Sequence, residues 1–592
     1  MRKKIIAILG VLMVLLLAVF VWNRADAHAS APNPKNVSVT VPMSLEVVFE
    51  HDGSTIVEDV GIQNDSLVPI QLVGIDVSEY NDWEVVSSDK QIALDTKNIS
   101  FQFEGQDLMP GSNQMYYEVL EGSSRNFSVD VKRGAWTRDA EVEKALQLDF
   151  FYEIGRKNFT LTLEDGVHDK ETIIAENFSN VTLPSRDRDD YEFVGWQDED
   201  GKIHKDIYNM PVGDTTLNAV WNEKVAYAIF SETDKSLTFV KTANEIQPGD
   251  VYNGKTVTNV YTGFEDAVYT SYTEVPWYKN YYTNRINAVY VDSVIKPIST
   301  AYWFAYQEFC QYLDLTNLSM SRATDMQYMF YRTGRSLDDK TDFTIRGMED
   351  WDVSKVTNMQ YAFTYSGIFA PDYNVGNIGK WDVSNVTNMR RMFQAVGMRA
   401  TNIQIGDLSN WNTGKVTDMS GMFDTFAYFT PTWNVGNLGK WNVSNVTNMA
   451  NMFTDCAVDS NTFNIGDLSN WNTGKVTDMS SMFAWAGYSV SSFNIGNIGK
   501  WDVSQVTSMI SMFSTTAKEA KTFYIGDLSN WNTGNVTTMY TMFSGTAPNA
   551  NWSQNLSKWN VNKVERYWEF SYGVEKKITS PKWVLQEPNY AV

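Results

Sequence analysis

The sequence predicts a chain of several domains, in which a β-sandwich and a smaller β module precede an α/β solenoid with a short parallel sheet. Three observations predict this fold class. A thirty-residue repeat runs through 351–543, a short alternating segment precedes each repeated tryptophan, and apolar residues spaced by three and four follow it. A fixed period of this size is typical of solenoids, in which each coil packs on its neighbours.

The repeat is made of columns of matching residues. After each tryptophan, a valine follows at five residues, a methionine at eight and a phenylalanine at twelve. The tryptophans are Trp351, Trp381, Trp411, Trp441, Trp471, Trp501 and Trp531. The phenylalanines are Phe363, Phe393, Phe423, Phe453, Phe483, Phe513 and Phe543. One coil cannot bury its own apolar edge, so matching columns predict a core that is shared along the stack.

Two kinds of local structure are expected in each coil. Residues 463–465 alternate and predict a short strand. Residues 476–483 space their apolar side chains by three and four, which predicts one or two helical turns with Thr477 as the cap. Stacked strands would form a parallel sheet with coils ~4.8 Å apart. A recurring glycine, such as Gly466, indicates a backbone bend or a close approach between coils.

Alternate coils differ, which gives a second period of sixty residues. One type contains Gly-Lys-Trp, at Trp381, Trp441 and Trp501, and the other contains Ser-Asn-Trp, at Trp411, Trp471 and Trp531. The alternation suggests duplication of a two-coil unit. The ends are irregular, as terminal coils are expected to be: Leu318 replaces the tryptophan of the first coil, and the coil that begins at Trp559 lacks the methionines.

The string Trp-Asp-Val-Ser-Asn-Val-Thr-Asn-Met-Arg-Arg-Met-Phe at 381–393 resembles the BspA-type leucine-rich-repeat family of bacterial surface proteins. The resemblance extends over roughly residues 300–571. It implies an extracellular, leucine-rich-repeat-like solenoid at 318–571, of a kind often found on adhesins, and no agreed catalytic residues. The thirty-residue coil is slightly longer than the usual leucine-rich period.

Residues 1–29 predict a signal peptide or an N-terminal anchor. Basic residues at 2–4 precede an apolar run at 5–22, and small residues follow. The run is long for a signal core and close to a membrane-spanning length, so two outcomes stay open. The segment is either cleaved near Ala29 or retained as a transmembrane helix. Residues 572–592 are expected to form a C-terminal tail, which has neither an apolar segment nor a sortase-type motif.

Two β-rich segments follow the N-terminal segment. Residues 30–155 contain short alternating runs separated by turn residues, which predicts an immunoglobulin-like β-sandwich that serves as a spacer. Within 156–223, the residues at 191–196, then Met210 and Pro211, then 214–221 resemble the Listeria–Bacteroides repeat. That resemblance implies a small β-grasp-like stalk module. Residues 224–317 are expected to cap the first coil, because a stack needs its apolar edge covered.

Charge and cysteine content narrow the function classes. The net charge of −23 disfavours binding to nucleic acid or to anionic membrane surfaces. Cys310 and Cys456 are five coils apart, roughly 24 Å at the strand spacing, whereas a disulfide needs Cα atoms within ~7 Å. Both are therefore expected to be buried free thiols. No histidine lies beyond His204, so a Cys–His catalytic pair within one domain is not expected.

The repeated polar and aromatic columns have competing interpretations. An Asn/Asp column, with Asn437 and Asp467 as examples, offers one oxygen per coil, which favours turn hydrogen bonds over calcium ligation. The tryptophan column is either a buried ladder or an exposed platform for sugar rings, and its apolar neighbours favour the ladder. The methionine columns are expected to fill gaps in the core. No zinc spacing and no phosphate-binding loop occur, so no catalytic residue, metal or cofactor is predicted.

These patterns lead us to expect a non-enzymatic, secreted or cell-surface protein. Its repeats would bind an extracellular protein or a glycan, as adhesins do, without a nucleic-acid partner and with membrane contact only through an N-terminal anchor. The alternative is a carbohydrate-binding surface module that uses exposed aromatic side chains. Neither the binding residues nor the ligand follow from the sequence.

Overall fold

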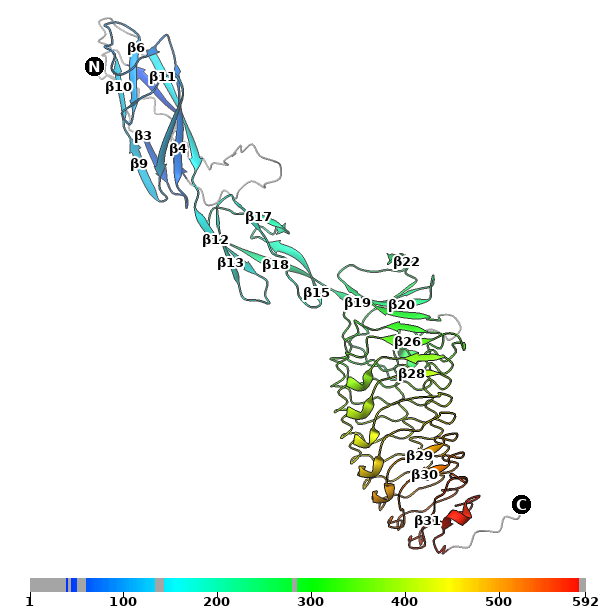
Figure 1. Ribbon diagram of the computed structural model, residues 1–592. Coiled ribbons are helices and arrows are strands. Elements are labelled where there is room, and N and C mark those ends of the chain that lie inside the picture. The colour runs from blue at the N-terminus through cyan, green and yellow to red at the C-terminus, as the bar shows by residue number, and fades with distance from the viewer. Residues whose placement is uncertain (1–38, 41–43, 50–59, 134–142, 279–284, 585–592) are drawn as a thin grey trace. The chain divides into compact units, whose positions relative to one another are not determined.

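A computed structural model describes residues 39–40, 44–49, 60–133, 143–278 and 285–584 (Figure 1). The chain divides into two compact units, Met1–Asn222 and Glu223–Val592. The predicted signal peptide or anchor at 1–29 lies outside the described residues. Within the described part, no helix has the length and hydropathy needed to cross a bilayer.

The first unit begins with three β-sheets. Their orders are β2-β11-β4-β8, β1-β3-β9 and β10-β6-β5, with β7 paired to β6. The strands are β1 (Val39–Thr40), β2 (Ser44–Phe49), β3 (Val60–Asn64), β4 (Ile70–Glu79), β5 (Glu84–Val85), β6 (Asn98–Phe103), β7 (Gln106–Asp107), β8 (Gly111–Val119), β9 (Ser123–Phe127), β10 (Val129–Arg133) and β11 (Glu143–Ile154). Inward residues alternate with exposed ones in β3, as the pleat of a half-buried strand requires.

A five-stranded sheet of order β13-β12-β18-β15-β16 and a separate β14-β17 pair complete the first unit. The strands are β12 (Asn158–Glu164), β13 (Glu171–Glu176), β14 (Asn180–Thr182), β15 (Tyr191–Gln197), β16 (Ile203–His204), β17 (Ile207–Asn209) and β18 (Thr215–Glu223). Trp196 is fully buried, and its indole N–H donates to the carbonyl of Pro184 at 2.7 Å. A buried indole needs such an acceptor, so this bond fixes the orientation of the ring.

The second unit starts with an eight-stranded sheet of order β23-β19-β20-β24-β25-β26-β27-β28. The antiparallel pair β19–β20 leads into parallel strands from β20 onward. The strands at this end are β19 (Val225–Ser231), β20 (Ser236–Thr242), β21 (Val251–Tyr252), β22 (Lys255–Thr256), β23 (Asn259–Tyr261) and β24 (Ala288–Val291), with one 3₁₀ turn, η2 (Tyr272–Glu274). The β21–β22 hairpin packs Tyr252 and Val257 on the outer face of β19 and β20.

The rest of the second unit is a stack of coils (Figure 1). Each coil from Trp381 to Trp501 contains a strand or extended segment, a three-residue 3₁₀ turn before the tryptophan and a run of turns after it. The strands are β25 (Tyr312–Asp314), β26 (Phe343–Arg346), β27 (Asp372–Asn374), β28 (Asn402–Gln404), β29 (Ser492–Asn494), β30 (Thr522–Tyr524), β31 (Gln554–Asn555) and β32 (Ile578–Thr579). The 3₁₀ turns are η3 (Ile378–Lys380), η4 (Leu408–Asn410), η5 (Leu438–Lys440), η6 (Leu468–Asn470), η7 (Ile498–Lys500) and η8 (Glu575–Lys577).

The predicted fold class, with its α/β leucine-rich-repeat-like solenoid, is wrong. No α-helix occurs among the described residues, and the parallel sheet stops at β28 before a separate β29–β30 pair. Residues 476–483 form successive turns, in which Ser481 has a φ of 54°, a value that interrupts a right-handed helix. Thr477, predicted as a helix cap, donates its hydroxyl to the carbonyl of Thr447 at 3.0 Å.

Hydrogen bonds between coils replace the helical bonds that the spacing predicted. The backbone N–H groups of Met479, Ser481 and Phe483 donate to carbonyls of the next coil at 3.1, 2.7 and 2.9 Å. A helix would direct these donors to the residue four positions earlier. The apolar spacing is therefore satisfied by turns that bury Val476, Met479, Met482 and Phe483 and leave the residues between them exposed or half-buried.

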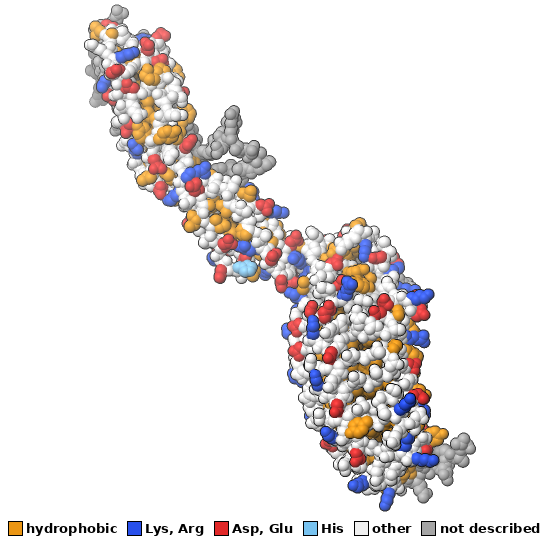
Figure 2. Space-filling view, viewed as in Figure 1, with side chains coloured by type: hydrophobic (Ala, Val, Ile, Leu, Met, Phe, Trp, Pro, Cys, Tyr) orange, Lys and Arg blue, Asp and Glu red, His pale blue; other side chains and the backbone are white. Residues whose placement is uncertain are grey.

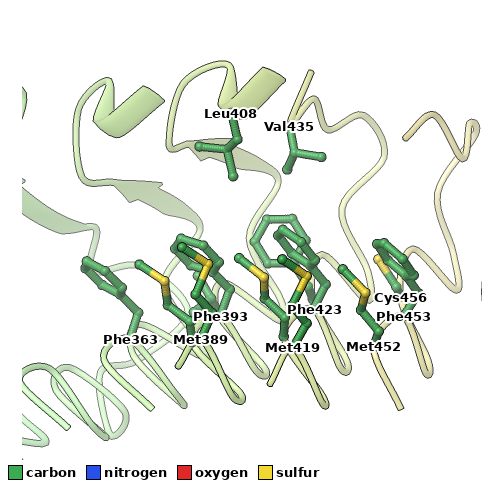
Figure 3. Packing of buried hydrophobic residues seen from close by; sticks show 14 of the residues in the cluster. Phe363, Met389, Phe393, Leu408, Met419, Phe423, Val435, Met452, Phe453 and Cys456 are labelled. Atoms are coloured by element: carbon green, nitrogen blue, oxygen red, sulfur yellow. The ribbon is translucent and has the colours of Figure 1, made fainter. Parts of the chain in front are cut away.

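The core of the second unit is one continuous cluster that follows the columns of the repeat. Figure 3 shows Phe363, Phe393, Phe423 and Phe453 in a row, with methionines between them. Neighbouring rings of this row lie 5.5–5.7 Å apart and within 15° of parallel. The tryptophans also stack, in pairs such as Trp351–Trp381, with centroids 6.0 Å apart. Interlocked columns of this kind bind each coil to the next.

Candidate binding surface

The tryptophan column is a buried ladder, as the favoured interpretation predicted. Trp381, Trp411 and Trp471 are each only 3% exposed. Their indole N–H groups donate to main-chain carbonyls of the preceding coil at 2.7–3.1 Å. This column therefore does not serve as an exposed sugar platform, and aromatic binding residues must be sought elsewhere.

The Asn/Asp column forms turn hydrogen bonds, also as predicted. Asn437 accepts a hydrogen bond from the N–H of Gly439 at 3.0 Å, and Asp467 accepts one from Ser469 at 2.9 Å. These bonds cap the 3₁₀ turns η5 and η6. In the part of the chain that the structure describes, no three His, Cys, Asp or Glu side chains gather where a metal ion could bind.

Both cysteines are buried free thiols, which confirms the prediction. Burial raises the pKa of the Cys310 thiol to about 12. Burial, with Asp424 and Asp455 nearby, also raises the pKa of Cys456. Because the thiolate is the reactive form, neither residue is suited to act as a nucleophile.

A group of half-buried tyrosines covers the turn side of the first coils. The rings of Tyr302, Tyr328 and Tyr361 form a stack in successive coils. Tyr302 and Tyr328 lie 5.0 Å apart with an interplanar angle of 8°, and Tyr328 and Tyr361 lie 4.6 Å apart at 11°. The stack extends across three coils as one continuous aromatic row.

Five more tyrosines join this row. Tyr331 contacts Tyr306, Tyr328 and Tyr365, with centroids 5.2–6.0 Å apart. Tyr272, in η2, lies 4.3 Å from Tyr306 and 4.8 Å from Tyr278. We call the whole group the tyrosine surface: Tyr272, Tyr278, Tyr302, Tyr306, Tyr328, Tyr331, Tyr361 and Tyr365.

Backbone conformation turns several of these side chains outward. Tyr302, Tyr306, Tyr328, Tyr361 and Tyr365 all have φ between 56° and 64°. A bulky residue is unusual in this left-handed region and is strained there by about 1–3 kcal/mol.

The next coil places Arg391 at the position of Tyr328 and Tyr361, and the three coils after it place smaller residues there. Gly421, Asn451 and Ser481 stand there, also with positive φ. Glycine and asparagine tolerate this conformation better than tyrosine does. Bulky residues at positive φ recur in later coils, for example Arg391 and Trp485, so the conformation belongs to the repeat and only the choice of tyrosine is particular to the first coils.

Arginines border the tyrosine surface. The guanidinium groups of Arg390 and Arg391 lie 5.8 and 5.9 Å from the ring centroid of Tyr361, and that of Arg332 lies 5.1 Å from Tyr306. The buried carboxylate of Glu308 lies 3.2 Å from Arg332 and 3.8 Å from Arg335, which fixes these cations. Cation–π contacts of this kind contribute about 0.5–1 kcal/mol at exposed sites.

The phenols of Tyr302, Tyr328 and Tyr331 have raised pKa values and stay protonated at neutral pH. Burial, followed by the neighbouring tyrosines, raises the pKa of Tyr328 to about 12. Burial likewise raises the pKa of Tyr302 and Tyr331. The surface therefore offers neutral hydroxyl groups beside positive charge.

The sequence patterns did not predict this surface. The signal was present: the column ten residues after the tryptophan position holds tyrosine at 328 and 361, but arginine, glycine, asparagine and serine in later coils. We expected a helix in this segment, which would have scattered these residues around its axis. Only the stacked turns place Tyr302, Tyr328 and Tyr361 in one row.

One comparison with known proteins gave a match. A family model described as "Mycoplasma protein of unknown function, DUF285" matches residues 298–404, 334–457, 396–488 and 485–576. The overlapping matches cover the repeated coils, and the described part of each match lies within the second unit. No curated protein and no solved structure matches the chain.

Proposed function

We propose that this chain is a non-enzymatic, secreted or cell-surface protein whose repeated coils bind an extracellular partner, as adhesins do. The tyrosine surface is the observation that supports the proposal. Tyrosine and arginine are enriched at the energetic centres of protein interfaces, because they combine large contact area with polar groups. Eight contiguous tyrosines bordered by arginines fit that composition.

The signal-like segment at 1–29 and the resemblance of 381–393 to BspA-type surface proteins support an extracellular location. Figure 2 shows acidic and basic side chains interspersed over the visible face of the coils. The net charge of −23 disfavours nucleic acid as the partner. Attachment through an N-terminal anchor remains part of the proposal.

A protein partner fits the tyrosine surface better than a glycan does. Sugar rings stack on open aromatic faces, whereas the faces of Tyr302, Tyr328 and Tyr361 pack against one another. Arg390 and Arg391 lie over the ring of Tyr361. The stack therefore presents ring edges and hydroxyl groups, which suit backbone and side-chain hydrogen bonds of a protein.

The test compares two double variants of the full chain. In Tyr328→Ser/Tyr361→Ser, the centre of the stack is lost. In the control, Tyr524→Ser/Tyr572→Ser, two exposed tyrosines of the last coils are lost. Binding to immobilised extracellular-matrix proteins and to whole cells is measured by surface plasmon resonance and flow cytometry.

We expect the first variant to bind at least about 30-fold more weakly, since a hot-spot residue contributes about 2 kcal/mol or more. The control should bind like the unmodified chain. If both variants bind equally well, the tyrosine surface is not the binding site. Circular dichroism verifies that both variants are folded.

A further inference from the structure

A second candidate site lies at the start of the second unit, on the opposite side of the sheet from the core. A cavity of about 190 Å³ opens between the outer face of β19, β20 and β24 and the β21–β22 hairpin. Sites for drug-sized ligands usually measure roughly 300–1,000 Å³. The cavity therefore has room for one small ring or a group of similar size.

The cavity floor is polar and incompletely hydrogen-bonded. Ser231, Ser236 and Thr238 line it and are each at most 7% exposed. Ser236 donates its hydroxyl to Asp234 at 2.7 Å. The hydroxyl of Thr238, by contrast, has no hydrogen-bond partner among the described residues, although Thr238 is 7% exposed. Solvent in the cavity reaches this hydroxyl, so a ligand hydroxyl can replace water as its hydrogen-bond partner.

Tyr290 stands beside Thr238 in the parallel register of β20 and β24. Its hydroxyl also lacks a hydrogen-bond partner among the described residues. The ammonium group of Lys255 lies 5.0 Å from the Tyr290 ring centroid and 2.6 Å from Asp234. The lysine is therefore already neutralised and positioned on one side of the cavity.

The carboxylate of Asp292 lines the opposite wall of the cavity and accepts two hydrogen bonds. One oxygen of Asp292 accepts hydrogen bonds from the hydroxyl of Tyr252 at 3.1 Å and the amide of Asn253 at 2.9 Å. Burial, followed by the charge of Asp292, raises the pKa of Tyr252 to about 12, so this phenol remains a donor. The other oxygen of Asp292 has no partner among the described residues and can accept a ligand hydroxyl.

This set of groups selects among ligand classes. The ammonium of Lys255 is paired with Asp234, which does not line the cavity, and Asp292 adds a negative charge to the cavity wall, which disfavours anions. An apolar ligand would leave the hydroxyls of Thr238 and Tyr290 unpaired. A neutral ring with several hydroxyl groups can donate to Asp292, exchange hydrogen bonds with Thr238 and Tyr290, and place its apolar face on an aromatic side chain.

We propose that this cavity binds a single sugar ring, such as the terminal unit of a glycan, through Thr238, Tyr290 and Asp292. The second sugar of such a glycan would lie near another aromatic side chain, because Tyr312 lies 6.0 Å from Tyr290 on the same face of the sheet. The site is separate from the tyrosine surface, so the two proposals can fail independently.

The experiment uses the full chain and a panel of methyl glycosides, including glucose, galactose, mannose, fucose and N-acetylglucosamine, titrated by calorimetry. Thr238→Val removes one hydroxyl at constant shape, and Asp292→Asn removes the charge of the carboxylate. Thr256→Val is the matched control, because Thr256 is exposed on the same hairpin and does not line the cavity.

At least one glycoside is expected to bind saturably to the unmodified chain. Thr238→Val should weaken that binding about five- to tenfold and Asp292→Asn at least about tenfold. Thr256→Val and Tyr328→Ser/Tyr361→Ser should bind normally. The proposal is overturned if no glycoside saturates, or if Thr238→Val and Asp292→Asn bind as tightly as the unmodified chain while their thermal unfolding shows that they are folded.

Discussion

Trp351 differs from the later tryptophans of its column in one hydrogen bond. Trp501 donates its indole N–H to the carbonyl of Leu468 at 2.9 Å, and Trp381 donates to that of Met348 at 2.7 Å. The indole N–H of Trp351 has no partner among the described residues, although the residue is only 6% exposed. The preceding coil has a different length, since 33 residues separate Trp351 from Leu318, so its carbonyls are placed differently.

This difference gives a matched pair of substitutions. Trp351→Phe and Trp501→Phe remove similar apolar volume, but only the second removes a hydrogen bond. We expect Trp501→Phe to lower the free energy of unfolding by about 1 kcal/mol more than Trp351→Phe does. Urea unfolding followed by far-ultraviolet circular dichroism measures both. Equal losses would show that the indole hydrogen bonds add nothing to the packing of the column.

Asp455 is a half-buried carboxyl close to a second one. Burial, followed by the charge of Asp424, raises the pKa of Asp455 to about 6. Burial also raises the pKa of Asp424. The folded state therefore binds a proton at Asp455 more tightly than the unfolded chain, whose aspartates have a pKa of about 3.9. Stability from this group is fully present below pH 3.9 and is lost as the pH rises through about 6.

Asp455→Asn should remove this pH dependence, because an amide stays neutral and asparagine tolerates the φ of 50° found here. At pH 7.5 the variant should be more stable than the unmodified chain by about 1 kcal/mol, a value reduced for the partial exposure of the site. At pH 4 the two should be nearly equal. Thermal and urea unfolding at both pH values measure the difference. The exposed Asp459→Asn serves as the control, and a variant that is less stable at pH 7.5 would contradict the prediction.

At the scale of elements, the turn run after each tryptophan explains why one part of the fold was predictable and another was not. The columns of Trp, Met and Phe were correctly predicted to be buried, because their spacing records which side chains face the core. Spacing by three and four does not distinguish a helix from successive turns, since both place those residues on one side. The decisive feature is the positive φ at Tyr361, Arg391 and Ser481, and no shared residue type marks that position.

Neighbouring coils approach so closely at some 3₁₀ turns that only glycine fits there. A Cβ atom at Gly439 would lie 2.0 Å from the backbone carbonyl oxygen of Asp467, whereas one at Gly414 would lie 3.1 Å from the side-chain amide of Asn442. The first neighbour is backbone and cannot rotate away, while the second is a flexible side-chain end.

We therefore expect Gly439→Ala to destabilise the second unit by more than about 3 kcal/mol, and Gly414→Ala by less than about 1 kcal/mol. Urea unfolding of the two variants of the full chain provides the comparison. Similar losses in the two variants would mean that coils can shift apart at η5 without cost.

At the scale of the molecule, the two coil types have complementary contacts. Asp407, Asp467 and Asp527 present backbone carbonyls to the glycine of the preceding coil. Asn437 and Asn497 instead present N–H groups, each of which donates to a serine hydroxyl of the preceding coil at 2.6 Å. Serine beside a carbonyl at the glycine position would clash, so two coils of the Ser-Asn-Trp type cannot be neighbours without rearrangement. The sixty-residue period seen in the sequence has this contact as its physical cause.

Two internal deletions test this alternation. Deletion of 437–496 removes two coils and joins Gly436 to Asn497, which preserves the order of coil types. Deletion of 437–466 removes one coil and places Ser409 against Asp467. Because stack stability depends on contacts between neighbours, we expect the larger deletion to keep a melting temperature within a few degrees of the full chain and the smaller one to lower it more. A lower melting temperature for the two-coil deletion would contradict the contact rule.

The candidate sites illustrate what sequence patterns leave out. Free thiols at Cys310 and Cys456 and the turn role of Asn437 and Asp467 follow from spacing alone, and the structure confirms them. The tyrosine surface depends on a turn conformation, and the cavity depends on a hairpin folding over a sheet face. A repeat column does hold Tyr328 and Tyr361, but only the turn conformation shows that they face outward in one row, and the residues of the cavity share no period at all.

The methionine columns have a chemical consequence for a protein exposed to oxidants. Met389, Met419, Met452 and Met479 are fully buried, so peroxide can reach their sulfur atoms only when a coil opens. A sulfoxide adds a polar oxygen that the closed column cannot accommodate, and reclosure would then be impaired. Oxidation of one sulfur would loosen the contacts of both adjoining coils and expose the next. Chemical damage would in this way spread along the chain from the first opened position, and its extent would report how often the stack opens.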